Sequence, residues 1–147
     1  MFQNLMKSSK QKLILIGGGG HCKSCIDVIE KEGRFQISGI VDVPEKYGEK
    51  ILNYEIFAND EHFPELVKDY KNFLITLGQI KTPVKRINLF DQLKQLGASF
   101  VISISPSANV SKHAKIEEGS IVMHGANINA SATIGKNCII NTSALVE

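Results

Sequence analysis

The first hundred residues alternate short apolar runs with apolar stripes of helical spacing. An apolar run at residues 12–16 ends in the glycines 17–20, which predicts a buried strand followed by a tight turn. The apolar positions from His21 onward recur at helical spacing, and Gly33 is placed to cap the end of that helix. Residues 35–41 then predict a second strand.

The same alternation continues toward residue 104. Residues 43–59 are expected to form a loop with at most one short strand. The elements predicted after that loop are a helix over 61–70, a strand over 73–77 that ends at Gly78, a helix over 84–96 and a strand over 100–104. The second of these helices carries an apolar stripe of Ile87, Phe90, Leu93 and Leu96. Strands that alternate with helices imply a small parallel sheet covered by helices, an α/β fold.

Beyond this point the pattern changes to a repeat of six residues. Small residues occupy every sixth position: Ala108, Ala114, Ser120, Ala126, Ala132, Cys138 and Ala144. Aliphatic residues lie two places after each of them: Val110, Ile116, Val122, Ile128, Ile134, Ile140 and Val146. No α-helix has this period, whereas a parallel β-helix does, with each hexad forming one short strand and one corner. The aliphatic residue then points into an interior too narrow for an aromatic ring.

The distribution of aromatic residues places a boundary at the same position. Every Phe and Tyr lies between Phe2 and Phe100, and charged residues become sparse after residue 100. Two parts with different interiors explain this division most simply. We therefore expect a polar tail at residues 1–11, an α/β domain at 12–103 and an incomplete β-helix at 104–147.

The overall composition excludes several classes of protein. With 43% hydrophobic residues and a net charge of +2, the chain is typical of a globular protein, not of a disordered chain or a dedicated nucleic-acid binder. The apolar run at residues 13–16 is too short for a membrane span or a signal peptide, so a cytoplasmic location is expected. Three cysteines, an odd number, do not form a disulfide framework, in keeping with a reducing compartment.

The glycine turn after the first strand is the first candidate site. It consists of Gly17, Gly18, Gly19 and Gly20. Ligands of parallel sheets bind at the carboxyl ends of strands, and a helix N-terminus beside a glycine turn favours a phosphate group. Asp42, at the end of the second strand, can accept hydrogen bonds from a ribose or a base, and His21 can donate to an oxygen of the ligand. These features predict a nucleotide-bearing ligand. The alternative is that the glycines only permit close strand–helix packing, that Asp42 starts a turn and that His21 faces solvent.

Three other motifs overlap or adjoin this turn. Residues 17–24 resemble a phosphate-binding P-loop, but Cys22 stands where that motif has glycine before Lys23, which disfavours ATP hydrolysis. Cys22 and Cys25 form a C-x-x-C pair at a helix start, where a thiolate would be stabilised, although packing of small residues explains both. A zinc site would need Cys138 and scattered histidines, so no metal is expected. The histidines other than His21 are interpreted as ordinary surface residues: His62, His113 and His124.

Five segments carry a resemblance to a known family. They are residues 14–23, 40–42, 77–79, 105–108 and 139–142. Through them the chain resembles the bacterial nucleotide-sugar N-acetyltransferases and sialic-acid O-acetyltransferases with hexapeptide repeats. The resemblance covers residue 12 to the end and implies a Rossmann-like domain followed by a left-handed parallel β-helix with three hexads in each coil. The aliphatic residues would then stack in three columns: Val110, Ile128 and Val146; Ile116 and Ile134; Val122 and Ile140.

The same resemblance implies a function and a set of binding residues. A nucleotide-linked amino sugar would bind at the glycine turn together with His21, Lys23 and Asp42, and Gly78 and Gln79 would border it. The acetyl group would come from acetyl-CoA, bound along the β-helix between subunits of a homotrimer. The family's histidine base would follow directly after Glu147, so we expect no catalytic residue here and a chain that is part of a longer enzyme and inactive alone. O-acetylation of a sialic-type sugar, or a non-catalytic nucleotide-sugar-binding module, remain the alternatives.

Overall fold

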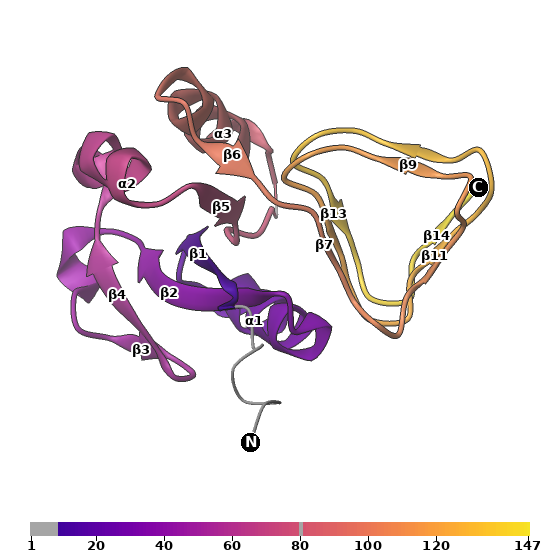
Figure 1. The fold of residues 1–147 in the computed structure, drawn as a ribbon, viewed down its shortest axis with the longest axis horizontal. Coiled ribbons are helices and arrows are strands. Elements are labelled where there is room, and N and C mark those ends of the chain that lie inside the picture. The colour runs from indigo at the N-terminus through magenta and orange to yellow at the C-terminus, as the bar shows by residue number, and fades with distance from the viewer. Residues whose placement is uncertain (1–8, 80) are drawn as a thin grey trace.

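The computed structural model describes residues 9–79 and 81–147 as an α/β unit beside a three-sided coil of short strands (Figure 1). Most of the predicted polar tail, residues 1–8, lies outside the described residues. Its last residue, Gln11, is already the first residue of strand β1 (Gln11–Ile16). The α/β class and the parallel β-helix predicted from the sequence are both confirmed.

The α/β unit is built on one six-stranded sheet. Its elements after β1 are α1 (Gly20–Glu32), β2 (Phe35–Val41), β3 (Lys50–Ile51), β4 (Tyr54–Ala58), α2 (Phe63–Asp69), β5 (Asn72–Ile75), α3 (Val84–Gln95) and β6 (Ser99–Phe100), with short 3₁₀ turns at Pro44–Lys46 and Asp60–His62. The strand order is β3-β4-β2-β1-β5-β6, and all pairs are parallel except β3 with β4. The carboxyl ends of β1, β2 and β5 therefore meet at one edge, where the glycine turn lies.

Strand β1 divides the apolar interior of the α/β unit into two layers, because successive side chains of a strand point to opposite faces. Leu13 and Leu15 pack in one cluster with α1, whereas Ile14 and Ile16 pack in a second cluster with α2 and α3. The α1 layer also includes Ile121 and Met123 of the β-helix. Helix α1 is thus sandwiched between the sheet and the β-helix, as Figure 1 shows.

The β-helix consists of two-residue strands stacked in three columns. They are β7 (Ser103–Ile104), β8 (Asn109–Val110), β9 (Lys115–Ile116), β10 (Ile121–Val122), β11 (Asn127–Ile128), β12 (Thr133–Ile134), β13 (Ile139–Ile140) and β14 (Leu145–Val146). The columns are β7-β10-β13, β8-β11-β14 and β9-β12, all parallel. Ile128 pairs with Val110 and Val146, Ile134 with Ile116, and Val122 with Ile140, so the predicted stacking of the aliphatic residues is confirmed.

Several predicted elements differ from the structure, among them the strand predicted over 73–77, because β5 ends at Ile75. The segment 43–59 holds two short strands, β3 and β4, where at most one was expected. The predicted strand 100–104 is split: β6 ends the sheet, and β7 already pairs with β10 in the β-helix. On α3 the apolar stripe is incomplete, because Ile87 and Leu96 are exposed while Arg86 is buried. The guanidinium group of Arg86 forms hydrogen bonds to neighbouring elements, described below. These bonds allow Arg86 to be buried although the apolar pattern of the helix predicts an exposed side chain.

Candidate functional site

The glycine turn is fixed by the backbone of neighbouring strands. The amide of Gly17 donates to the carbonyl of Val41 at 2.8 Å. Gly17 has φ +113°, and a Cβ atom there would lie 2.7 Å from the amide nitrogen of Leu77. The amide of Gly18 donates to Oδ2 of Asp42 at 2.7 Å. The first two glycines are buried, so they shape the turn, while Gly19 and Gly20 are exposed.

Asp42 holds the turn through its carboxylate. It accepts hydrogen bonds from the amides of Gly18 and Val43, each at 2.7 Å, and from the Lys46 ammonium at 3.3 Å. Burial raises the pKa of this carboxyl, but the two amides and Lys46 outweigh burial and hold its pKa below the ordinary value. The carboxylate therefore stays ionised near neutral pH and tethers the ends of β1 and β2.

A cavity of about 590 Å³ opens beside the exposed glycines. Its walls are formed by Gly19, Gly20, His21, Leu77, Gly78, Gln79, Ile139 and Asn141. One wall is the N-terminus of α1, the second is the end of β5, and the third is β13 with the corner that follows it. We call this space the larger cavity, and its size is that of a small-molecule binding site.

A smaller cavity of about 100 Å³ lies at the same edge of the sheet, on the side of α2 and α3. It is lined by Ile16, Gly17, Val41, Asp42, Val43, Pro44, Asp60, Phe63, Leu77, Lys85 and Leu89. The binding residues expected from the sequence are therefore divided: five line the larger cavity and two, Gly17 and Asp42, line the smaller one. Gly18 and Lys23 line neither, and the Lys23 side chain is exposed.

His21 contributes the imidazole ring of the larger cavity. Its Nε2 atom lies 3.2 Å from Sγ of Cys25, one helical turn later. Burial, and to a lesser degree the positive charge of Arg86, lower the pKa of His21. The ring is therefore neutral near neutral pH and can act as both a donor and an acceptor of hydrogen bonds. His21 is half-buried in the cavity wall, and its binding of a ligand stays a prediction.

The surroundings of the C-x-x-C pair make its two thiols unreactive. Cys22 and Cys25 are both fully buried on α1. Burial raises the pKa of the Cys22 thiol to about 11, and it also raises the pKa of the Cys25 thiol. A redox pair needs an accessible thiolate, so the geometry disfavours that alternative. Packing against the sheet accounts for both residues.

The reactivity of the thiols tests this conclusion. We expect a single thiol, that of the partly exposed Cys138, to react rapidly with a disulfide reagent in the folded protein. Cys22 and Cys25 should react only after unfolding in guanidinium chloride. The released chromophore can be counted with time, and the Cys138→Ser variant serves as the control, with no rapid phase. Rapid modification of Cys22 or Cys25 in the folded chain would revive the redox interpretation.

Arg86 is a site residue that the apolar pattern of α3 did not reveal. It is only 2% exposed, and its guanidinium donates to the carbonyls of Ile75 and Leu77 at the end of β5. It also donates to the carbonyl and the side-chain oxygen of Asn137, at 3.0 and 2.8 Å. Arg86 thereby joins the sheet to the β-helix next to the larger cavity. Arg86 itself lines a further cavity of about 580 Å³, between α3 and residues 136–140.

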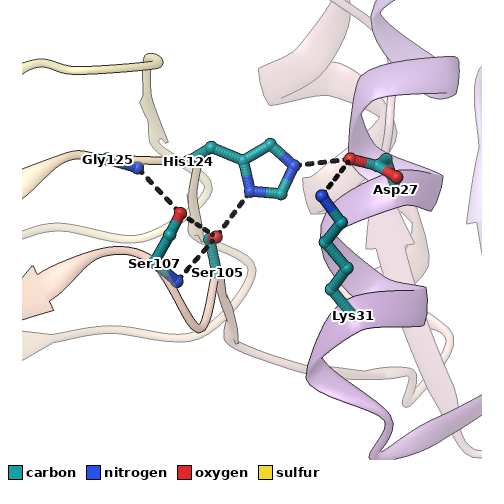
Figure 2. A network of polar contacts seen from close by, with 6 residues as sticks. All are labelled: Asp27, Lys31, Ser105, Ser107, His124 and Gly125. Carbon is teal, nitrogen blue, oxygen red and sulfur yellow. Dashed lines mark hydrogen bonds and ion pairs between the residues drawn. The ribbon is translucent and has the colours of Figure 1, made fainter.

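His124 was wrongly interpreted as an ordinary surface residue. Figure 2 shows its ring between Ser105 of the β-helix and Asp27 of α1. Nδ1 lies 2.6 Å from the Ser105 hydroxyl oxygen and Nε2 lies 2.7 Å from Oδ2 of Asp27. Nothing in the spacing of the sequence signals this contact, because Asp27 and His124 are 97 residues apart. His113 is exposed as expected, and the ring of His62 accepts a hydrogen bond from the amide of Asn59.

Two other possible features receive no support from the described residues. Within residues 9–79 and 81–147, no group of three or more His, Cys, Asp or Glu side chains is arranged to hold a metal ion. None of the helices in that part of the chain is both long and apolar enough to cross a membrane.

Comparisons with known proteins agree with this architecture. Among solved structures, a mutant perosamine N-acetyltransferase from Caulobacter crescentus, in complex with CoA and GDP-perosamine, is 32% identical with a TM-score of 0.84. The acetyltransferase domain of PglB from Neisseria gonorrhoeae, in complex with acetyl coenzyme A, is 25% identical with a TM-score of 0.81. Each alignment covers 94% of this chain but only 63% and 65%, respectively, of the solved chains. No curated protein sequence matches the chain.

A protein family also matches the α/β unit directly. The family described as the PglD N-terminal domain matches residues 12–93, which is more than half of the chain. The matched range contains the glycine turn, Asp42, the end of β5 and most of α3, and thus every lining residue of the two cavities except Ile139 and Asn141. The chain therefore belongs to the PglD N-terminal domain family, with a parallel β-helix following that domain.

Proposed function

We propose that this chain is the sugar-binding part of an acetyl-CoA-dependent N-acetyltransferase that acts on a nucleotide-linked amino sugar. The observation that carries the proposal is the larger cavity, which lies between the N-terminus of α1 and the β-helix. The solved relatives are similar over 94% of the chain and were obtained with CoA and GDP-perosamine or with acetyl coenzyme A. An acceptor sugar held in this cavity would be next to the repeat on which acetyl-CoA binds in the proposed enzyme.

The start of α1 is suited to the phosphates of such a ligand. Gly19 is the N-cap residue, no side chain caps the helix, and no acidic residue lies in its first turn. The first amides of a helix and its dipole attract anions, and here they face the larger cavity without a competing carboxylate. The absence of a Cβ atom at Gly19 and Gly20 lets a phosphate approach the backbone closely.

The two cavities suggest how the ligand is divided. The larger one has the volume for the pyrophosphate and the sugar, with His21, Gln79 and Asn141 offering hydrogen bonds. The smaller one is mainly apolar but contains Asp42 and Asp60, which suits a base or ribose that donates hydrogen bonds. The glycine turn lies between the two cavities, so a ligand that occupies both would place its diphosphate over the turn.

Acetyl transfer to the sugar requires an unprotonated amine, which attacks the thioester carbonyl of acetyl-CoA as a base accepts its proton. The tetrahedral intermediate then collapses with cleavage of the C–S bond, so that the amide forms and CoA leaves as a thiolate, which takes up the proton. Donors must also stabilise the oxyanion of the tetrahedral intermediate. In this proposal His21 binds and orients the sugar, and no residue of this chain is assigned as the base. The homotrimer and a histidine as the base remain predictions of the resemblance.

Replacing Gly19 by leucine tests the binding site. A Cβ atom at Gly19 meets nothing within 4 Å, and the backbone there is extended, so the variant should fold while its side chain enters the larger cavity. Calorimetric titration with GDP-perosamine and with a UDP-linked 4-amino sugar should show binding to the parent chain. We expect the affinity to fall at least about 30-fold in Gly19→Leu, the effect of losing roughly 2 kcal/mol of ligand contacts.

The matched control is Gly135→Leu, at an exposed glycine of the β-helix that is also free of close contacts and lines none of the three cavities. It should bind each nucleotide sugar like the parent chain. Equal affinity of Gly19→Leu and the parent for every nucleotide sugar would contradict the proposed site. A parent chain that binds none of them would contradict the proposed function itself.

A further inference from the structure

His124 is held by both of its ring nitrogens. Its partner Asp27 is a carboxylate, which can only accept, so the Nε2 atom of His124 carries the proton and donates at 2.7 Å. In the tautomer that carries the proton on Nε2, Nδ1 is the acceptor, and the Ser105 hydroxyl donates to it at 2.6 Å. The hydrogen bond from His124 is the main reason why the pKa of Asp27 lies below its ordinary value. The ring thus has one orientation, set from two sides (Figure 2).

Further hydrogen bonds fix the β-helix end of this network. The amide of Ser107 donates to the Ser105 hydroxyl oxygen at 3.2 Å, and the amide of Gly125 donates to the Ser107 hydroxyl oxygen at 3.1 Å. These bonds connect the corner after β7 with the corner after β10, one coil further along. His124 is therefore an extension of a rigid corner of the β-helix that contacts α1 through its imidazole ring.

A Ser–His–Asp order suggests nucleophilic catalysis, but the surroundings of Ser105 exclude that reading. Ser105 is only 1% exposed, and its hydroxyl oxygen already contacts His124 and Ser107. It lines none of the three cavities beside the sheet and the β-helix. A serine nucleophile needs space for a substrate carbonyl next to its oxygen. The network is therefore a contact between two parts of the fold.

The network connects two walls of the larger cavity: α1, through Asp27, and the β-helix, through His124. Asp27 lies two helical turns after Gly20, so it is on the same side of α1 as the N-terminal residue that lines the cavity. The carbonyl of His124 accepts a hydrogen bond from the amide of Ser143 at 2.9 Å, so its corner stacks on the corner that begins with Asn141. Asn141 lines the cavity from the β-helix side.

We propose that His124 is a positioning residue that holds the N-terminus of α1 at a fixed distance from the β-helix corner at Asn141, and so keeps the larger cavity in its binding shape. This proposal rests on the proposed function, since the binding shape is that of the nucleotide-sugar site. The side chains of Ile121 and Met123 pack in the same apolar cluster as α1. Apolar contacts are not directional, so the hydrogen bonds of the imidazole ring supply the directional contact at this junction.

The junction does not depend on His124 alone, so its variants should fold. Glu32, at the end of α1, accepts hydrogen bonds from the Ser103 hydroxyl at 3.0 Å and the Ile104 amide at 3.1 Å. Arg86 joins Asn137 on the opposite side of the junction. Removing the Asp27 contact should therefore loosen the start of α1 without separating the two parts of the fold.

Two substitutions separate the two contacts of the ring. The amide nitrogen of glutamine reaches the position of Nε2, so His124→Gln keeps the contact with Asp27. The shorter asparagine reaches only the position of Nδ1, so His124→Asn keeps the contact with Ser105 and loses Asp27. We expect affinity for GDP or UDP to stay within twofold of the parent in His124→Gln. It should fall about fivefold in His124→Asn, the net effect of one ordinary hydrogen bond, because the Asp27 carboxylate is half exposed.

A second readout does not require any ligand. The pKa of His21 is lowered mainly by burial in the cavity wall, and it can be followed by NMR titration of the imidazole ring. It should move toward its ordinary value in His124→Asn and in Asp27→Ala, because the loosened wall admits water, and stay low in His124→Gln. Asp27→Ala also removes the ion pair of Asp27 with Lys31, but that pair lies within α1 and does not cross the junction. Combining His124→Asn with Asp27→Ala should therefore add nothing to the change in the pKa of His21, since both remove the same contact across the junction.

The matched control is Glu118→Gln. It weakens the ion pair between Glu118 of the β-helix and Lys94 of α3, which also crosses the junction but does not involve α1. It should alter neither the nucleotide affinity nor the titration of His21. The proposal is overturned if the pKa of His21 in His124→Asn equals that in the parent. It is also overturned if Glu118→Gln changes the pKa of His21 as much as His124→Asn does. If the parent binds no nucleotide but the His21 titration changes as expected, the proposed function fails while the positioning contact stands.

Discussion

Replacing Arg86 by methionine is expected to lower the free energy of unfolding by about 3 kcal/mol, because buried acceptors left without a donor cost roughly 1–3 kcal/mol each. The variant removes every donor to Ile75, Leu77 and Asn137 that the guanidinium supplies. It also removes a buried charge that, among the described residues, has no carboxylate partner, which offsets part of the loss. The unpaired carbonyls should dominate, because they lie inside the junction between β5 and the β-helix.

Chemical denaturation of the parent and the variant measures this effect, with Lys85→Met as the control. Lys85 is the neighbouring residue on α3 and is exposed, so its loss should change the free energy of unfolding by less than about 0.5 kcal/mol. Equal stability of Arg86→Met and the parent would mean that the buried guanidinium costs as much as its hydrogen bonds contribute. In that case Arg86 would not be the structural link between the sheet and the β-helix.

Alanine at Gly17 is expected to be the most damaging small change in the glycine turn. The φ of +113° is strained for any residue with a Cβ atom, at a cost of about 1–3 kcal/mol. The added Cβ would also lie 2.7 Å from the nitrogen and 2.8 Å from the Cα of Leu77, both backbone atoms that cannot rotate away. Together we expect a loss of about 4 kcal/mol in the free energy of unfolding, by addition of strain and overpacking.

Gly19→Ala is the natural comparison, because it lies two residues later in the same turn. Its backbone is extended and its Cβ would meet open space, so we expect a loss of at most about 1 kcal/mol, the cost of alanine at an N-cap. Thermal or chemical unfolding of both variants shows the difference. If the two alanines destabilise the protein equally, the close approach of Gly17 to Leu77 does not exist in solution.

The β-helix could be predicted in detail because the pattern that specifies it repeats every six residues within one continuous segment. Each hexad repeats one small and one aliphatic position, so the pairing of Ile128 with Val110 and Val146 follows from counting residues. The glycine turn was predictable for a similar reason: an apolar strand, the glycines and a helix follow one another directly in the chain. In both cases the pattern lies within one continuous segment of the chain and needs no partner from elsewhere in the sequence.

The residues that the sequence did not reveal all depend on contacts between distant segments. Arg86 looks like an exposed charge on an apolar stripe, and only the approach of Asn137 and the end of β5 makes its burial favourable. Asn141 and Ile139 line the larger cavity because the β-helix folds back beside α1. His124 meets Asp27 for the same reason. A periodic pattern predicts which face of an element is apolar but not which other element will cover it.

The structure gathers most of the expected binding residues at one edge of the sheet but divides them between two cavities. Spacing alone places Asp42 and the glycines at one edge of the sheet, which the structure confirms. It does not say that the turn itself separates two cavities, with Gly19 on one side and Asp42 on the other. Asp42 is also occupied by Gly18, Val43 and Lys46, so part of its role is structural. Whether these residues bind ligand stays a prediction.

The location of a bound nucleotide sugar tests the central claim most directly. Backbone amide signals of the labelled chain can be followed by NMR during titration with GDP-perosamine and with a UDP-linked 4-amino sugar. The account predicts that the largest shifts occur at Gly19, Gly20 and Gly78, which line the larger cavity, with smaller shifts at Asp42. Shifts confined to residues 136–138 and α3, around the neighbouring cavity, would contradict the proposed site.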